Sequence, residues 1–123
     1  MNDSTSSLTT LYFDGSCPVC SREIALYQRQ AGADRVVWVD VARCEASNLG
    51  SDLSREAAMA RLHLRRPDGS LVSGAQAFTL LWQTLPRWAW LGRLFGSGRP
   101  LKMLEMVYRT FLFIRRRGWR RPL

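Results

Sequence analysis

The sequence of 123 residues predicts one domain of the α/β class, and three observations lead to that class. An apolar, β-rich run is followed by a pair of cysteines that opens a helical pattern, and a second β-rich run comes after that helix. Further along, an alternating stretch turns back on itself across a Pro-Asp-Gly-Ser turn. A hydrophobic fraction of 46% is ordinary for a single domain that buries a core.

The first strand is expected over residues 8–13, where Leu, Thr, Tyr and Phe are concentrated before an Asp-Gly pair breaks the run. A Cys-Pro-Val-Cys sequence follows at residues 17–20. Proline is best tolerated at the first position of a helix, so Pro18 places Cys17 at the N-cap. This helix is expected to cover residues 18–30 and to stop before a glycine.

The two sulfurs of this sequence are expected to have different surroundings. Free backbone N–H groups and the positive end of the helix dipole favour a thiolate at Cys17, so we predict that Cys17 is the exposed nucleophile. Cys20 shares one helical stripe with Ile24, Tyr27 and Ala31. That stripe predicts that Cys20 faces the interior as the sheltered, resolving thiol of a redox site.

The remaining elements follow from similar patterns. Residues 36–41 form a near-continuous β-branched and aromatic run, which predicts a strand at the centre of the sheet, parallel to the first strand. Residues 61–73 predict a β-hairpin. The other segments are helices expected at residues 54–59 and 74–85, a short aromatic-rich segment at 88–95, and an amphipathic helix at about 101–116.

This order, β-α-β-α-β-β-α with extra C-terminal helices, is that of a thioredoxin-like domain with three layers, α/β/α. We expect the domain to cover residues 8–114, between a polar tail at 1–7 and a basic tail at 115–123. The apolar side of the last helix is expected to consist of Met103, Leu104, Val107, Tyr108, Phe111 and Ile114.

A Cys-x-x-Cys pair has interpretations other than redox chemistry. One is half of a structural zinc site, but a closed site takes four ligands, and Cys44 and His63 do not form a second ligand pair. Another is a permanent disulfide or a pair of inert thiols. We therefore expect no metal, and we interpret Cys44 as a bystander and His63 as a packed or solvated strand residue.

The sequence around the cysteines resembles a known family. Asp14, Cys17 and Cys20 match the Asp-x-x-Cys-x-x-Cys signature of the DCC family, thioredoxin-like proteins described as thiol-disulfide oxidoreductases. The resemblance covers about residues 8–108 and implies a thioredoxin-like domain with a redox-active Cys-x-x-Cys site. The later similar blocks are residues 61–64, 68–69 and 73–78, Leu81-Trp82 and Leu85-Pro86.

The chain departs from the thioredoxin pattern at one place. Thioredoxins carry a cis-proline before the third strand, where the neighbouring backbone pairs with the substrate, whereas this chain has Ala-Met-Ala-Arg at residues 58–61. We expect Met59, Ala60 and Arg61, together with Pro18, to contact the substrate.

The predicted reaction is thiol-disulfide exchange, in which the Cys17 thiolate attacks a substrate disulfide and Cys20 resolves the mixed disulfide. The reaction requires no cofactor. Its expected partner is a disulfide-containing protein or a low-molecular-weight thiol compound. Asp14 is expected either to relay a proton to or from Cys20 or to shape the turn by bonding backbone N–H groups, and the two roles are compatible.

The net charge of +8 belongs to the second half of the chain. Residues 1–60 carry five Arg against eight Asp and Glu, and residues 61–123 carry thirteen Arg and Lys against two. The alternative function is a non-enzymatic adaptor or redox sensor that docks through this basic half, for example on an anionic membrane surface.

No nucleic-acid motif accompanies the basic residues, and no run approaches the roughly 20 apolar residues of a membrane span. A cytoplasmic location is expected because the N-terminus lacks signal-peptide features, and the sequence does not indicate an oligomeric state.

Overall fold

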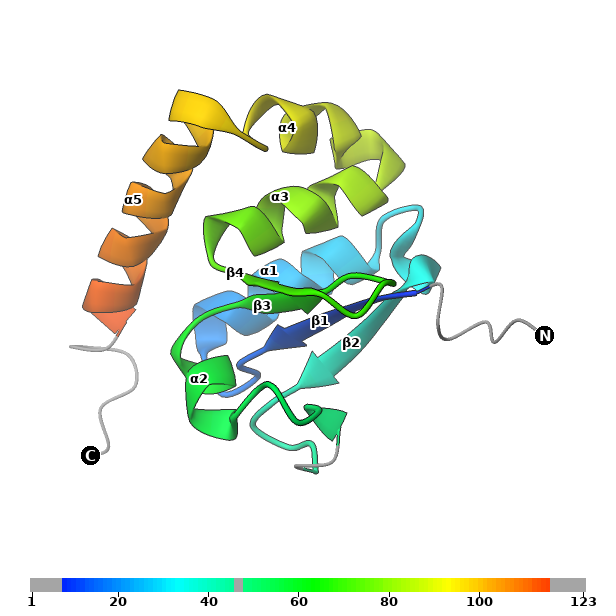
Figure 1. The fold of residues 1–123 in the computed structure, drawn as a ribbon, viewed down its shortest axis with the longest axis vertical. Helices are drawn as coiled ribbons and strands as arrows, with labels where there is room; N and C mark the ends of the chain where they lie inside the picture. The colour runs from blue at the N-terminus through cyan, green and yellow to red at the C-terminus, as the bar shows by residue number, and fades with distance from the viewer. Residues whose placement is uncertain (1–7, 46–47, 116–123) are drawn as a thin grey trace.

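Figure 1 shows the computed structural model of the chain, which describes residues 8–45 and 48–115. The four strands of its sheet have the spatial order β2-β1-β3-β4 and are β1 (Thr9–Phe13), β2 (Val36–Asp40), β3 (His63–Arg65) and β4 (Leu71–Ser73). β2 is parallel to β1, whereas β3 is antiparallel to both β1 and β4. The helices are α1 (Pro18–Gln28), α2 (Arg55–Ala60), α3 (Ala75–Thr84), α4 (Ala89–Leu94) and α5 (Gly98–Ile114), with 3₁₀ turns η2 (Ala33–Arg35) and η4 (Pro86–Trp88).

The helices cover both faces of the sheet, because alternate residues of the central strand β1 point to opposite sides. Leu11 packs with apolar residues of α1 and α3, such as Ile24 and Leu81. Tyr12 packs on the other side, in a second cluster that includes Ala58 of α2. Figure 1 accordingly shows α1 and α3 on one side of the sheet and α2 on the other. The three-layer, thioredoxin-like α/β architecture predicted from the sequence is confirmed.

The predicted place of the second strand is wrong. β2 lies at the edge of the sheet, and its Val37 side chain is 38% exposed. The hairpin of β3 and β4 pairs with the free side of β1, so β1 and β3 occupy the centre. The pattern of β2 indicated a strand correctly, but the neighbours of a strand depend on pairings between distant segments.

The last helix, α5, is amphipathic, but only part of its predicted apolar side is buried. Tyr108 packs edge-on against Phe78 of α3, with 5.3 Å between the ring centroids, and is buried. Met103 and Val107 are each 65% exposed and Ile114 is 48% exposed, because only one side of α5 meets the rest of the domain. Among the described residues, no helix is both long and apolar enough to cross a membrane. The predicted tail 1–7 and residues 116–123 of the predicted basic tail lie outside the described residues.

Candidate dithiol site

The cysteine pair lies at the start of α1, directly after the turn that follows β1. Cys17 is the N-cap of α1, and its Sγ accepts a hydrogen bond from the backbone N–H of Cys20, with 3.4 Å between nitrogen and sulfur. Pro18 occupies the start of the helix, as predicted. Cys17, Cys20 and Cys44 are all free thiols. The local geometry of the motif is therefore that of a dithiol built on a helix N-terminus.

The predicted exposure of the two sulfurs is wrong. Cys17 is completely buried, whereas Cys20 is half-buried. Hydrogen bonds close the turn before α1 and tie it to the helix: the Cys17 N–H donates to the Asp14 carbonyl and the Ser21 hydroxyl donates to the Gly15 carbonyl. Cys20 does lie on the inward stripe of α1, but that side of the helix also lines a cavity. The sulfur that a molecule entering this cavity meets is that of Cys20.

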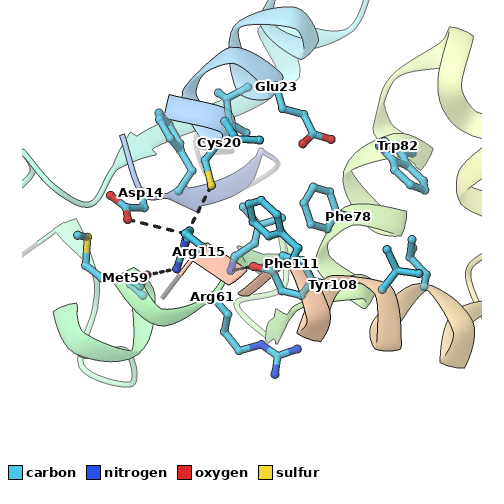
Figure 2. A pocket seen from close by; sticks show the side chains of 17 residues that line it. Asp14, Cys20, Glu23, Met59, Arg61, Phe78, Trp82, Tyr108, Phe111 and Arg115 are labelled. Atoms are coloured by element: carbon cyan, nitrogen blue, oxygen red, sulfur yellow. Dashed lines mark hydrogen bonds and ion pairs between the residues drawn. The ribbon is translucent and has the colours of Figure 1, made fainter. Parts of the chain in front are cut away.

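The cavity has a volume of about 260 Å³ and lies among side chains from α1, α2, α3 and α5. Figure 2 shows Cys20 directed toward Arg115 at one end, with aromatic side chains of α3 and α5 nearby. Most of the wall is apolar, and the apolar side chains in it are Phe13, Val19, Ile24, Ala58, Met59, Leu62, Phe78, Trp82, Leu104, Val107, Tyr108 and Phe111. The charged side chains in it are Asp14, Glu23, Arg61 and Arg115.

Arg115 is the residue of this site that the sequence interpretation misses, because it is the first residue of the predicted basic tail. The structure buries it, with 4% of its surface exposed. Its Nη1 lies 3.4 Å from the Cys20 Sγ and 3.9 Å from Asp14 Oδ2. Its Nη2 donates to the carbonyl oxygens of Met59 and Ala60, at 2.9 and 3.1 Å. One guanidinium thus joins the cysteine motif to the end of α2 (Figure 2).

A signal for Arg115 was present in the sequence. Leu104, Tyr108, Phe111 and Arg115 follow one another at steps of four, three and four, and all four line the cavity. The first three belong to the apolar side predicted for the helix, so a continuation of the same stripe leads to Arg115. A charged residue at the end of such a stripe is usually solvated, which is why the pattern alone did not indicate burial.

The surroundings of Cys20 disfavour its thiolate in this dithiol state. Burial raises the pKa of Cys20 to about 12, the neighbouring Cys17 thiol adds to the rise, and Arg115 acts against it. Burial lowers the pKa of the Arg115 guanidinium, but its interactions with Cys20, Cys17 and Tyr108 together raise that pKa above its ordinary value, and Arg115 is charged. At neutral pH the cavity contains a protonated Cys20 thiol beside a fixed positive charge.

Asp14 holds the turn between β1 and α1. It is 4% exposed, and its Oδ1 accepts hydrogen bonds from the backbone N–H and the hydroxyl of Ser16. The predicted turn-shaping role is therefore confirmed. Its Oδ2 faces Arg115, and the predicted proton relay stays a prediction. Gly15 donates its N–H to Asp40 Oδ1 at 2.9 Å, and any side chain at Gly15 would collide with that carboxylate.

Two of the four predicted substrate-contact residues line the cavity. Met59 and Arg61 do so, whereas Pro18 is exposed and Ala60 contributes a carbonyl to Arg115 instead. Arg61 also pairs with Glu105 of α5 at 2.8 Å. This ion pair connects α5 to the segment before β3.

The other residues considered from the sequence lie outside the cavity wall. His63 is buried on β3, and its Nδ1 lies 2.9 Å from the Arg61 carbonyl oxygen. Burial lowers the pKa of His63, which favours the neutral ring. Cys44 packs beside the cluster around Tyr12. Within residues 8–45 and 48–115, no group of three or more His, Cys, Asp or Glu side chains is placed to hold a metal ion.

Fold and site together define a thioredoxin-like protein with a free dithiol at the start of its first helix. Over residues 11–121 the chain matches the model of the DCC1-like thiol-disulfide oxidoreductase family, and it belongs to that family. Membership supports a redox function of the thiol-disulfide type.

Two further comparisons complete this picture. The chain is 31% identical over 77 residues to an uncharacterized chloroplastic protein of Arabidopsis thaliana. That match covers 59% of this chain and 35% of the plant protein, so the aligned part is about a third of the relative's length. No solved structure matches the chain.

Proposed function

We propose that the protein carries out thiol-disulfide exchange through a Cys17–Cys20 pair that cycles between dithiol and disulfide. The observation that carries this proposal is the position of the Cys20 sulfur in the wall of an apolar cavity, with Cys17 less than one helical turn away. The family supports the general redox function, and the cavity supports access of a second sulfur compound to Cys20.

The proposed order of steps begins at Cys20. The Cys20 thiolate attacks one sulfur of the substrate disulfide, forms a mixed disulfide and releases half of the substrate as a thiol. Cys17 then attacks the Cys20 sulfur and releases the second half, which leaves a Cys17–Cys20 disulfide. This order is the reverse of the one predicted from the sequence, because Cys17 is completely buried, whereas Cys20 lines the cavity. The same steps run backward when the protein oxidises a dithiol substrate.

Arg115 and Asp14 have supporting roles in this proposal. The Arg115 guanidinium favours the thiolate of Cys20 over the thiol, since a positive charge at 3.4 Å stabilises the anion. Asp14 acts as a positioning residue that orients Arg115 from the other side. A cytoplasmic location remains a prediction; thiol reductants in that compartment would return the pair to its dithiol form.

Single cysteine variants test the proposal. On a Cys44→Ser background, Cys17→Ser is expected to accumulate a mixed disulfide at Cys20 when treated with a small disulfide, because no resolving thiol remains. Cys20→Ser is expected to form no adduct, since its remaining thiol is buried. Intact-protein mass spectrometry detects the added half of the substrate. An adduct in Cys20→Ser alone would restore the order predicted from the sequence, and no adduct in either variant would reject the exchange reaction.

A second candidate function is that of a non-enzymatic adaptor. The side of α5 that faces solvent favours it, because this side carries exposed apolar residues. We propose an anionic membrane surface as its partner, because basic side chains flank this apolar face and the helix can lie in the plane of the headgroups. The basic residues are Arg99, Lys102 and Arg109, and the apolar ones, 48–69% exposed, are Met103, Met106, Val107, Phe113 and Ile114.

Vesicle binding tests this candidate. The protein is expected to sediment with vesicles of phosphatidylglycerol and not with vesicles of phosphatidylcholine, because its attraction is partly electrostatic. A Met106→Asp, Phe113→Asp double variant, which changes exposed side chains only, is expected to lose that binding. Equal recovery of both proteins in the pellet would reject the membrane partner.

A further inference from the structure

The cavity beside Cys20 points to the class of substrate. We infer that the protein exchanges with a low-molecular-weight disulfide whose body is apolar, either a short aliphatic chain or a single aromatic ring. This inference rests on the proposed thiol-disulfide exchange. It follows from the size of the cavity, from its lining and from the hydrogen bonds of the backbone beside it.

The size of the cavity limits its occupant. Its volume of about 260 Å³ exceeds the roughly 150 Å³ of an apolar cavity that accepts benzene. It is smaller than the roughly 300–1,000 Å³ typical of sites for drug-sized ligands. One ring or a short chain therefore fits next to Cys20, whereas a folded loop of a protein substrate does not.

The lining of the cavity selects an apolar body. Phe78, Tyr108 and Phe111 succeed one another along the wall, with centroid distances of 5.3 Å for the first pair and 6.3 Å for the second. The Tyr108 hydroxyl already accepts the Leu62 N–H at 2.6 Å, so it is engaged within the fold. Affinity in such a site comes mainly from the burial of apolar surface, and each buried CH₂ group increases the affinity about fourfold.

The backbone beside the cavity is engaged as well. A peptide that docks as an added strand needs free N–H and C=O groups on the protein. The carbonyls of Met59 and Ala60 both accept from Arg115, and the Leu62 N–H donates to Tyr108. In the thioredoxin pattern, this segment before β3 pairs with the peptide. Here its polar backbone groups are already hydrogen-bonded to Tyr108 of α5 and to Arg115, which follows α5. The cavity, and not this backbone, is left to select the substrate.

One turnover with such a substrate is balanced without any other reagent. The disulfide R–S–S–R loses its sulfur–sulfur bond and leaves as two R–SH molecules. The Cys17 and Cys20 thiols supply the electron pair and the two protons, and they become joined by the new disulfide bond. A single turnover of the reduced, full-length protein therefore suffices for a test.

The experiment compares dipropyl disulfide with bis(2-hydroxyethyl) disulfide, two dialkyl disulfides of similar size. The rate at which the reduced protein is oxidised is measured for each by acid quenching and mass spectrometry. Each rate is divided by that of free mercaptoethanol with the same disulfide, which corrects for intrinsic reactivity. The corrected rate is expected to be about tenfold higher for dipropyl disulfide, which is the increase in affinity that one to two buried CH₂ groups give.

Matched variants on α5 connect this preference to the cavity. Val107 lines the cavity and is 65% exposed, so Val107→Gln adds a polar group at the wall without disturbing the core. Met106, 69% exposed, is absent from the wall, and Met106→Gln is the control. Val107→Gln is expected to lower the preference for dipropyl disulfide severalfold, and Met106→Gln is expected to leave it unchanged.

The outcomes separate the two levels of the proposal. Oxidation by both disulfides at equal corrected rates, or a faster reaction with a disulfide-linked peptide, overturns the apolar substrate class while exchange itself stands. Equal preferences in Val107→Gln and the unaltered protein overturn the assignment to this cavity. No oxidation by either disulfide overturns the exchange function, and the substrate inference with it.

Discussion

Replacing Arg115 with methionine tests how the reactive sulfur is controlled. The substitution removes the positive charge 3.4 Å from the Cys20 Sγ and keeps a flexible, unbranched side chain, which is shorter than that of arginine. It also removes the two hydrogen bonds to the carbonyls of Met59 and Ala60. If Arg115 stabilises the thiolate, its loss must raise the pKa of Cys20 further, since the remaining influences of burial and of Cys17 both raise it.

The size of the effect follows from the kind of interaction. A hydrogen bond to a charged group contributes about 1.5–3 kcal/mol, which corresponds to about one to two pKa units. Cys20 is half-buried and solvent screens part of this interaction, so the lower end applies, about one unit. Below the pKa, the thiolate fraction at a fixed pH then falls about tenfold, and the rate of a reaction that requires the thiolate falls with it.

Alkylation by iodoacetamide measures this rate. On a Cys44→Ser background, the reaction of Cys20 is followed by intact mass between pH 8 and pH 10, with circular dichroism to confirm the fold. Because the pKa of Cys20 is raised to about 12, the rate is expected to keep rising over this whole range in both proteins. Arg115→Met is expected to react about tenfold more slowly, consistent with a shift of about one pKa unit.

Two controls make the result interpretable. Arg115→Lys keeps a positive charge and is expected to fall between the two proteins, whereas Arg109→Met removes an exposed arginine of α5 and is expected to change nothing. Faster alkylation in Arg115→Met would refute the reasoning, because Arg115 would then act as a cover over the sulfur and not as its charge partner.

Three further predictions concern the elements that hold the site. Tyr108→Phe leaves the buried Leu62 N–H without its acceptor and is expected to cost about 1–3 kcal/mol of stability, at roughly 4 °C of Tm per kcal/mol in thermal denaturation. Burial alone would raise the pKa of Glu105, but hydrogen bonds from an α3 amide and two arginines bring it below its ordinary 4.5. Glu105→Gln is thus expected to destabilise the protein at pH 7, and the difference in urea denaturation should shrink as the pH falls through that lowered pKa; a constant difference would contradict this. Gly15→Ala places a Cβ against the Asp40 carboxylate, which must move away, and is expected to lower Tm by several degrees in thermal denaturation; an unchanged Tm would contradict this steric account.

Those parts of the site that depend on neighbouring residues could be predicted from the sequence. Proline after Cys17 fixed the start of α1, and the sulfur of Cys17 accepts the amide that the N-cap position provides. Ser54 caps α2 in the same way, through the N–H of Ala57. Such features arise within one turn of helix, so spacing and residue type suffice to predict them.

Those parts that depend on distant segments could not be predicted. The relative exposure of the two sulfurs depends on the cavity that α5 completes, and Arg115 lies 95 residues after Cys20. The edge position of β2 similarly depends on which side of β1 the later hairpin joins. Helical periodicity predicts that a stripe faces inward, but it does not predict whether solvent reaches the space that the stripe faces.

The wall that α5 contributes to the cavity has a consequence for how such proteins diversify. The sheet, α1 and the cysteine pair all lie in the segment from β1 to β4. The cavity residues Leu104, Val107, Tyr108 and Phe111 belong to α5, a helix that follows this segment. Substitutions on that added helix can reshape what reaches the sulfur without altering the sheet or the motif. Two proteins with the same Asp-x-x-Cys-x-x-Cys signature can therefore acquire different substrate ranges, and knowing the signature does not reveal which.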